Sequence, residues 1–554
     1  MKQIAILLLA LLCQGITQAQ DIEKVNLKSP LKFSGSLSAN AGLSSISSGV
    51  SDRTSPYFYS FNTRFSLSWN EIKMPFYFSF RDHSFNYGAT VPRFRINPRY
   101  KWAELQVGDV FMKFNRYTLS QRNLKGAAVK LTPGKFRFQA LYGKIQELNS
   151  YRDTLMLGIS DEEVFSNKVI GLGLGVGSKS THIDVYALKT WTDQDLAEFT
   201  NTFLPRQDNV VIGSTGKLRI SRSLRLQYNF GLSALTYDKD AIGNSRTIAE
   251  NGLTGSLLEV NNSSGANYAG DVSINYSQGR FGMNGKITYI QPFYQPLTVA
   301  YINSDVLNYT IGSYVSLLSN KLYLNGSVGI QNNNVSGVDA FTTDRFIFNL
   351  MANAKLHKNL SANLSLNNFS QDLQAKLVNI EDLYTYAVTN QMKTLTLTHT
   401  LPSSLRTWTN RLSAGNSSLS TSNDNEEFSS GYDLLFVRWD GDMKMEPIGF
   451  SVNAGFNYQT YDREGLVNDN YGVTLGASKD LFEEKLSIQF KNTFNYLDQG
   501  EFREGTSLVT SLVGNYKVAD KSSLLLSIYR VSRKSAVRSD FTEFRSRFSY
   551  QQRF

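Results

Sequence analysis

A strict alternation of apolar and polar residues repeats along this chain from Leu31 to its last residue. In residues 57–70, aromatic and aliphatic side chains occupy nearly all odd positions, whereas serine, asparagine and arginine occupy most of the even ones. The same pattern recurs in residues 450–459 and 485–491. A period of two is that of a β-strand with one apolar and one polar face. The sequence therefore predicts an all-β fold.

The connections between these segments distinguish a membrane barrel from a soluble sandwich, which also alternates. Short turns, such as 132–135 and 319–320, alternate with long polar loops, of which 144–167 and 237–267 are among the longest. Short periplasmic turns and long extracellular loops are typical of outer-membrane barrels, whose tilted strands need about 9–11 residues to cross. We therefore expect a single large antiparallel transmembrane β-barrel over residues 31–554.

Parity constrains the number of strands, because both ends of a single-chain barrel lie on the periplasmic side. The segments found by alternation are odd in number, so one crossing is miscounted. The error lies between Tyr100 and Lys130, where two consecutive segments would have to cross in the same direction. Either residues 111–119 add a crossing or residues 100–109 do not cross. The expected barrel has 24 or 26 strands, at roughly 20 residues per strand.

Residues 1–19 have the pattern of a secretory signal peptide, with a basic Lys2, an apolar run and a small-residue cleavage site ending at Ala19. The apolar run is shorter than the roughly 20 residues of a membrane-spanning helix. Residues 20–30 are expected to be a short periplasmic tail. The only cysteine, Cys13, would leave with the signal, so we expect neither disulfides nor thiolate chemistry.

Aromatic residues mark the C-terminus and the expected strand ends. Phe548, Tyr550 and Phe554 share one face of the last segment, which resembles the C-terminal signal of outer-membrane barrels and implies insertion by the barrel-assembly machinery. All five tryptophans lie within a few residues of expected strand ends, as an interfacial girdle requires. The expected girdle residues are Trp69, Trp191, Trp408 and Trp439, and the fifth tryptophan is Trp102.

A narrower resemblance rests on residues 18–20, where the signal ends in Gln-Ala-Gln, and on residues 100–144, with Tyr100-Lys101-Trp102 and Pro133-Gly134-Lys135. These segments look like a group of large plug-less outer-membrane barrels of Bacteroidota. The resemblance implies a Gram-negative outer membrane and a barrel architecture. It implies little about what the barrel carries.

Residues that could support catalysis or cofactor binding are few. The four histidines are too scattered for a metal cage. Asp82-His83-Ser84 cannot form a triad on a strand, where neighbouring side chains point to opposite faces. The glycine-rich run 171–177 lacks the last glycine of a dinucleotide fingerprint, so Leu172, Leu174 and Val176 are expected to face lipid instead. We expect no enzyme, no cofactor and no metal.

The chain has a formal net charge of +10, one less after loss of Lys2, but its charges are scattered. No basic tract of the kind that follows phosphates is present, so we expect no nucleic-acid partner, and a polar lumen or lipid contact explains the charge better. Five arginines lie in the stretch that breaks parity. They are Arg93, Arg95, Arg99, Arg116 and Arg122. Inside the lumen they would form a basic constriction for anions, and on the surface they would merely be solvated.

Three functional hypotheses follow. The first is a porin-like channel whose polar lumen is narrowed by loops. The second is a structural barrel of an outer-membrane complex, with its long loops docking a surface lipoprotein or another barrel. The third, a hydrolase, lacks a plausible base. No plug domain is expected before Leu31, which argues against an energy-coupled transporter.

Overall fold

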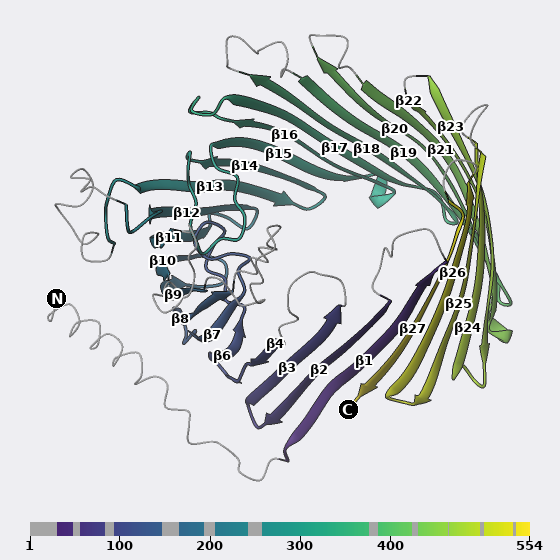
Figure 1. The fold of residues 1–554 in the computed structure, drawn as a ribbon, viewed down its shortest axis with the longest axis horizontal. Coiled ribbons are helices and arrows are strands. Elements are labelled where there is room, and N and C mark those ends of the chain that lie inside the picture. The colour runs from purple at the N-terminus through teal and green to yellow at the C-terminus, as the bar shows by residue number, and fades with distance from the viewer. Residues whose placement is uncertain are drawn as a thin grey trace.

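The computed structural model describes residues 30–47, 56–83, 93–146, 166–192, 205–241, 258–375, 386–423, 430–463, 465–498, 504–535 and 539–554. Within these residues, 27 strand segments form one sheet. The first strand pairs antiparallel with the last, so the sheet closes on itself as a barrel (Figure 1). The predicted signal peptide lies outside the described residues. The predicted tail lies outside them too, except for its last residue.

The first part of the wall consists of β1 (Lys32–Ile46), β2 (Tyr57–Trp69), β3 (Ile72–His83), β4 (Arg93–Ile96), β5 (Arg99–Tyr100), β6 (Ala103–Val110), β7 (Leu124–Leu131), β8 (Phe136–Gln146), β9 (Ser166–Gly177), β10 (His182–Thr192), β11 (Asp208–Arg219), β12 (Leu224–Thr236), β13 (Ser264–Gln278) and β14 (Phe281–Ile290). The second part consists of β15 (Val306–Leu317), β16 (Leu322–Asn333), β17 (Phe341–His357), β18 (Leu360–Ala375), β19 (Tyr386–Pro402), β20 (Thr407–Asn423), β21 (Ser430–Met445), β22 (Phe450–Arg463), β23 (Leu466–Leu481), β24 (Leu486–Asp498), β25 (Glu504–Ala519), β26 (Ser522–Ser535) and β27 (Phe541–Arg553). Two single-turn 3-10 helices, Leu318–Asn320 and Glu446–Ile448, lie in turns.

The wall has 26 crossings, because β4 and β5 are two pieces of one strand between β3 and β6. The higher of the two expected counts is confirmed, but both explanations of the miscount are wrong. Residues 103–110 do cross, and residues 111–119 do not. The uncounted crossing is 93–100, where Pro98 has no N–H to donate and divides the strand into pieces too short to show alternation.

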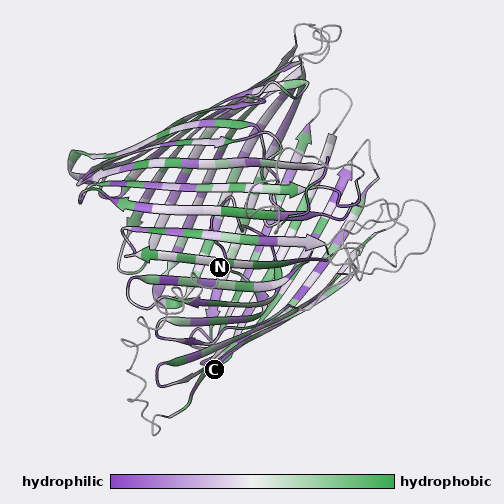
Figure 2. Ribbon diagram, turned by 90° about the vertical axis from the view of Figure 1, so that its left-hand side faces the viewer, coloured by the Kyte–Doolittle hydropathy of each residue, from purple (hydrophilic) through white to green (hydrophobic). Residues whose placement is uncertain are grey.

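The alternation of the sequence becomes an inner and an outer face, because directly paired residues of neighbouring strands share a face. Figure 2 shows hydrophobic and hydrophilic residues alternating along the strands. Leu172 and Leu174 are about half exposed on the outer face, at 50% and 52%, as the sequence predicted. Only lipid suits a closed wall with such an outer face, so the chain is a transmembrane barrel of the outer membrane.

The two rims of the barrel differ in the length of their connections. Turns such as 132–135 and 279–280 are short, and β1 begins and β27 ends at the same rim. The other rim carries the long connections, for example 147–165 and 237–263. This arrangement confirms the prediction and identifies the short-turn rim as periplasmic. No helix among the described residues is long and apolar enough to span a membrane.

The tryptophans occupy different depths of the wall. Trp69 is the last residue of β2, Trp191 lies next to the end of β10, and Trp408 is the second residue of β20. Trp439 lies further inside β21, and Trp102 lies in the turn before β6. The interfacial girdle stays a prediction.

The facing of the strands can be tested with one charge placed on either side. Phe456 and Phe490 are exposed on the outer face, whereas Asn457 and Gln489 lie on the inner one. An arginine at Phe456 or Phe490 should lower the free energy of unfolding by roughly 2–4 kcal/mol if near the bilayer midplane. Denaturant titration in lipid vesicles measures this change. Arginine at Asn457 or Gln489 is the control, and equal losses at both sets would refute the assignment of faces.

Candidate functional site in the barrel lumen

Two loops at the long-loop rim turn inward and lie inside the ring of strands (Figure 1). They are residues 111–123, between β6 and β7, and residues 291–305, between β14 and β15. Ser120 and Val299 form a parallel β-bridge between them. The Tyr294 hydroxyl donates a hydrogen bond to the Tyr117 carbonyl oxygen at 2.6 Å. The two loops therefore form one joined unit, which we call the inward loops.

The inward loops pack on an apolar part of the inner face. Phe114 and Leu119 lie in a buried cluster with Leu141 and Leu188 of the wall, and the Phe114 ring stacks on Tyr186 with centroids 4.8 Å apart. A second buried cluster consists of Tyr117, Ala269, Ile290, Tyr294 and Val306. Apolar side chains inside a barrel need another apolar surface to cover them, and the inward loops supply it.

Glycines in the wall allow the loop backbone to approach closely. A Cβ atom on Gly231 would lie 2.5 Å from the Tyr294 hydroxyl and 2.7 Å from the Tyr117 Cβ. A Cβ atom on Gly213 would overlap the Thr118 methyl group. Because no side chain fits at these distances, β11 and β12 need glycine where the inward loops cross them.

The Asn115 side chain fastens the first loop to the wall. Its Nδ2 donates to the carbonyl oxygens of Ser214 and Phe230, at 3.1 and 2.9 Å. Its Oδ1 accepts from the backbone amides of Tyr117 and Thr118, both at 2.9 Å. Asn115 is only 3% exposed, so these hydrogen bonds form in a site shielded from water. A buried, fully paired amide of this kind fixes one loop conformation.

Tyr117 connects the inward loops to a charged pair on the wall. Its hydroxyl donates to Asp271 Oδ2 at 2.8 Å. Asp271 also accepts from Asn229 at 3.1 Å and lies 3.6 Å from Lys286 Nζ. Burial raises the pKa of the Tyr117 hydroxyl, and the Asp271 carboxylate raises it further. The hydroxyl therefore stays protonated and donates to Asp271 throughout the physiological range of pH.

The five predicted arginines divide into two groups. Arg93 and Arg95 pair with Ser79 and Tyr77, and Arg99 pairs with Lys73, which places all three on the inner face of β4 and β5. These three arginines therefore belong to strands of the wall and not to a loop. Arg116 and Arg122 belong to the first inward loop, where Arg116 is exposed and Arg122 half-buried.

Aromatic rings contact two arginines of the inner face, Arg95 and Arg64. The Arg95 guanidinium lies 4.6 Å from the centroid of the Phe111 ring and 5.7 Å from that of Tyr77. Arg64 of β2 lies 5.2 Å from the same Tyr77 ring. Stacking of this kind orients a guanidinium and leaves its N–H groups free for a solute. The role of these arginines as a constriction stays a prediction.

Basic side chains continue beyond the predicted set and line one part of the inner face, which we call the arginine wall. It consists of Arg533 of β26, Arg545 and Arg547 of β27, Arg64 of β2, Lys73 and Arg81 of β3, and Arg93, Arg95 and Arg99 of β4 and β5. Glu543 pairs with Arg545, and Glu104 lies 3.3 Å from Arg99. Elsewhere the inner face carries both signs, as where Arg438 lies 2.7 Å from Asp440.

Metal-binding groups do not gather in the part of the chain that the structure describes. No three histidine, cysteine, aspartate or glutamate side chains lie close enough there to hold a metal ion. The side chains of Asp82 and His83, and all of Ser84, lie outside the described residues.

No protein-family model and no curated protein matches the chain. Among solved structures, it is similar to OccAB4 of Acinetobacter baumannii, at 12% identity and a TM-score of 0.30, over 70% of this chain and 98% of that one. It is similar to OpdQ of Pseudomonas aeruginosa, at 10% identity and 0.31, over 95% and 98%. It is also similar to the translocation pore of the P pilus usher PapC, at 8% identity and 0.27, over 94% and 99%. The strand pairing of the chain itself defines its class, a large closed transmembrane β-barrel.

Proposed function

We propose that this barrel is a porin-like channel, through which water-soluble solutes diffuse with a preference for anions. The observation that carries the proposal is the exposure of the inner face away from the inward loops. Among the described residues of β18–β25, only the glycines 441, 455, 472 and 476 are buried. A single-layer wall whose inward side chains stay accessible encloses water, and water connects the two rims.

The inward loops narrow this lumen without filling it. Their contacts lie on the wall between β6 and β15, where the buried side chains gather. A barrel of this many strands would leak freely if nothing entered it. The inward loops therefore reduce the pore, as infolded loops do in channels that select by size and charge.

The preference for anions follows from the arginine wall. Among the residues that the structure describes, only two of its cations form ion pairs with acids, Arg99 with Glu104 and Arg545 with Glu543. The membrane around the lumen has a low dielectric constant, which strengthens the field of the arginine wall. Anions should therefore be concentrated along the arginine wall, which runs from β26 through β27, β1, β2 and β3 to β4 and β5, and cations should be depleted there.

Planar-bilayer recording tests the proposal. The purified barrel should form channels that open without an energy source, and their reversal potential in a KCl gradient should have the sign of chloride selectivity. A barrel that inserts but conducts nothing would refute the channel. If it also co-purified from native membranes with a surface lipoprotein or a second barrel in fixed ratio, the assembly role would replace it.

A further inference from the structure

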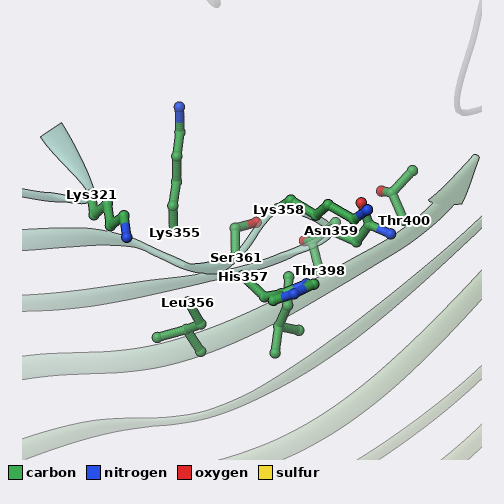
Figure 3. A pocket seen from close by; sticks show the side chains of 10 residues that line it. Lys321, Lys355, Leu356, His357, Lys358, Asn359, Ser361, Thr398 and Thr400 are labelled. Carbon is green, nitrogen blue, oxygen red and sulfur yellow. The ribbon is translucent and has the colours of Figure 1, made fainter. Parts of the chain in front are cut away.

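A second basic region lies in a cleft at the short-turn rim, where β16–β19 meet. The cleft has a volume of ≈ 600 Å³ and is shown in Figure 3. Its basic lining residues are Lys321, Lys355, His357 and Lys358. A neighbouring cleft of ≈ 280 Å³ shares Lys321 and Lys355 and is lined mostly by amide and hydroxyl side chains. The two clefts form one polar surface, separate from the arginine wall.

The hairpin of β17 and β18 brings these groups together. The Lys355 amide donates to the Lys321 carbonyl oxygen at 2.7 Å, which places Lys321, in the turn before β16, opposite Lys355 of β17. The register shifts between Lys355 and His357, so the strand bulges at the cleft and redirects its side chains. Figure 3 shows Lys355 and Leu356 pointing to opposite sides.

Hydroxyl groups lie on the same face as Lys355. Lys355 pairs with Ser361, and Ser361 pairs with Thr398, so all three share the inner face. Thr400 also lines the cleft. Ammonium groups supply charge, and hydroxyl groups supply donors whose direction can adapt to an oxyanion.

The charge of this cleft is not compensated locally. None of its lining residues is acidic. The turn before β24 offers a comparison, because the Lys517 amide donates to the Lys485 carbonyl oxygen at the same 2.7 Å, and β25 has the same kind of register shift. There, however, Glu483 and Glu484 lie in the turn beside Lys485. The same backbone geometry thus occurs with acidic neighbours at the turn before β24 and without acidic lining residues at the cleft.

We propose that this cleft binds a phosphate group, carried either by a free solute or by the headgroup of an inner-leaflet lipid. Several ammonium groups around one cavity suit a multiply charged oxyanion better than a singly charged carboxylate, because each adds to the attraction. The position of the cleft at the short-turn rim fits both sources. Lipid headgroups lie at the depth of this rim, and a solute that crosses the lumen passes the same rim. The site does not depend on ion conduction.

Calorimetric titration with inorganic pyrophosphate tests the site on the whole barrel in a neutral detergent at low ionic strength. The triple variant Lys321→Gln, Lys355→Gln, Lys358→Gln should bind pyrophosphate about tenfold more weakly than the parent, a loss of about 1.4 kcal/mol. The control variant Lys485→Gln, Lys517→Gln, Lys521→Gln removes the same charge at the same rim and should bind like the parent. Heat-modifiable electrophoretic mobility checks that each variant is folded.

Equal weakening in both triple variants would mean that net charge alone attracts the anion, and would overturn the site. Absence of saturable binding by the parent would overturn it as well. Nanodiscs distinguish the two sources. If phosphatidylglycerol, compared with phosphatidylcholine, blocks pyrophosphate binding to the parent, a lipid headgroup occupies the cleft, and unchanged binding assigns it to a solute. A parent that conducts nothing yet binds pyrophosphate would refute the channel and leave this site standing.

Discussion

Leucine at both Gly213 and Gly231 is expected to expel the inward loops and to raise single-channel conductance at least about twofold, because the pore then loses its narrowing. Neither position has room for a side chain, since Thr118, Tyr117 and Tyr294 occupy that space. Overpacking at two adjoining strands leaves the loops no place on the wall. Conductance in planar bilayers measures the result.

A second measurement reports the loops directly. Thr118 is completely buried, so a cysteine placed there in the parent should resist a water-soluble thiol reagent. In the double leucine variant the same cysteine should react quickly. Leucine at Gly285 and Gly514 is the control, because a Cβ atom at either position meets nothing within 4 Å. A double variant with parental conductance and a protected cysteine would show that the inward loops do not set the width of the pore.

Reversing charge on the arginine wall is expected to convert anion selectivity into cation selectivity. The variant Arg64→Glu, Arg95→Glu, Arg547→Glu removes three cations and adds three anions on one part of the inner face. The reversal potential in a KCl gradient should then change sign, because the field that concentrates chloride becomes one that concentrates potassium.

The matched control for this variant makes the same change of charge elsewhere in the lumen. Arg345, Arg411 and Lys491 lie on the inner face of β17, β20 and β24. Glutamate at all three should reduce anion selectivity without reversing it. Equal shifts in both variants would mean that the total charge of the lumen, rather than the arginine wall, determines selectivity.

Much of the wall could be predicted from the sequence, because a strand with lipid on one side and water on the other carries apolar and polar residues at alternate positions. This holds for residues 57–70 and 450–459, most of which lie in β2 and β22. It fails in residues 93–100, where Pro98 interrupts the pattern. It also misleads at residues 111–119, whose apolar side chains pack inside the barrel rather than against lipid. Periodicity indicates that an apolar residue is shielded from water, but it does not show whether lipid or another part of the protein shields it.

The arginine wall was predictable only in part, for a geometric reason. Arg93, Arg95 and Arg99 are close in sequence and could be predicted as a basic cluster. Arg64 appears in the sequence only as one polar residue of an alternating strand. Arg545 and Arg547 alternate with the terminal aromatics, so their inward direction could have been inferred. Their adjacency to β2 and β3 could not, because it arises from the pairing of β1 with β27.

The pairing of β1 with β27 also constrains how the chain can be synthesised and assembled into a barrel. The Ser549 hydroxyl donates to Asn40 at 2.7 Å across 509 residues, and the Phe554 amide donates to the Gly35 carbonyl oxygen. Bringing such distant segments together costs about 5 to 6 kcal/mol of chain entropy by the (3/2)RT ln n relation. Until the final strand arrives, both sheet edges keep unpaired backbone groups that lipid does not tolerate. A nonsense mutation that removes β27 should therefore leave an unsealed sheet, which periplasmic proteases would degrade before it matured.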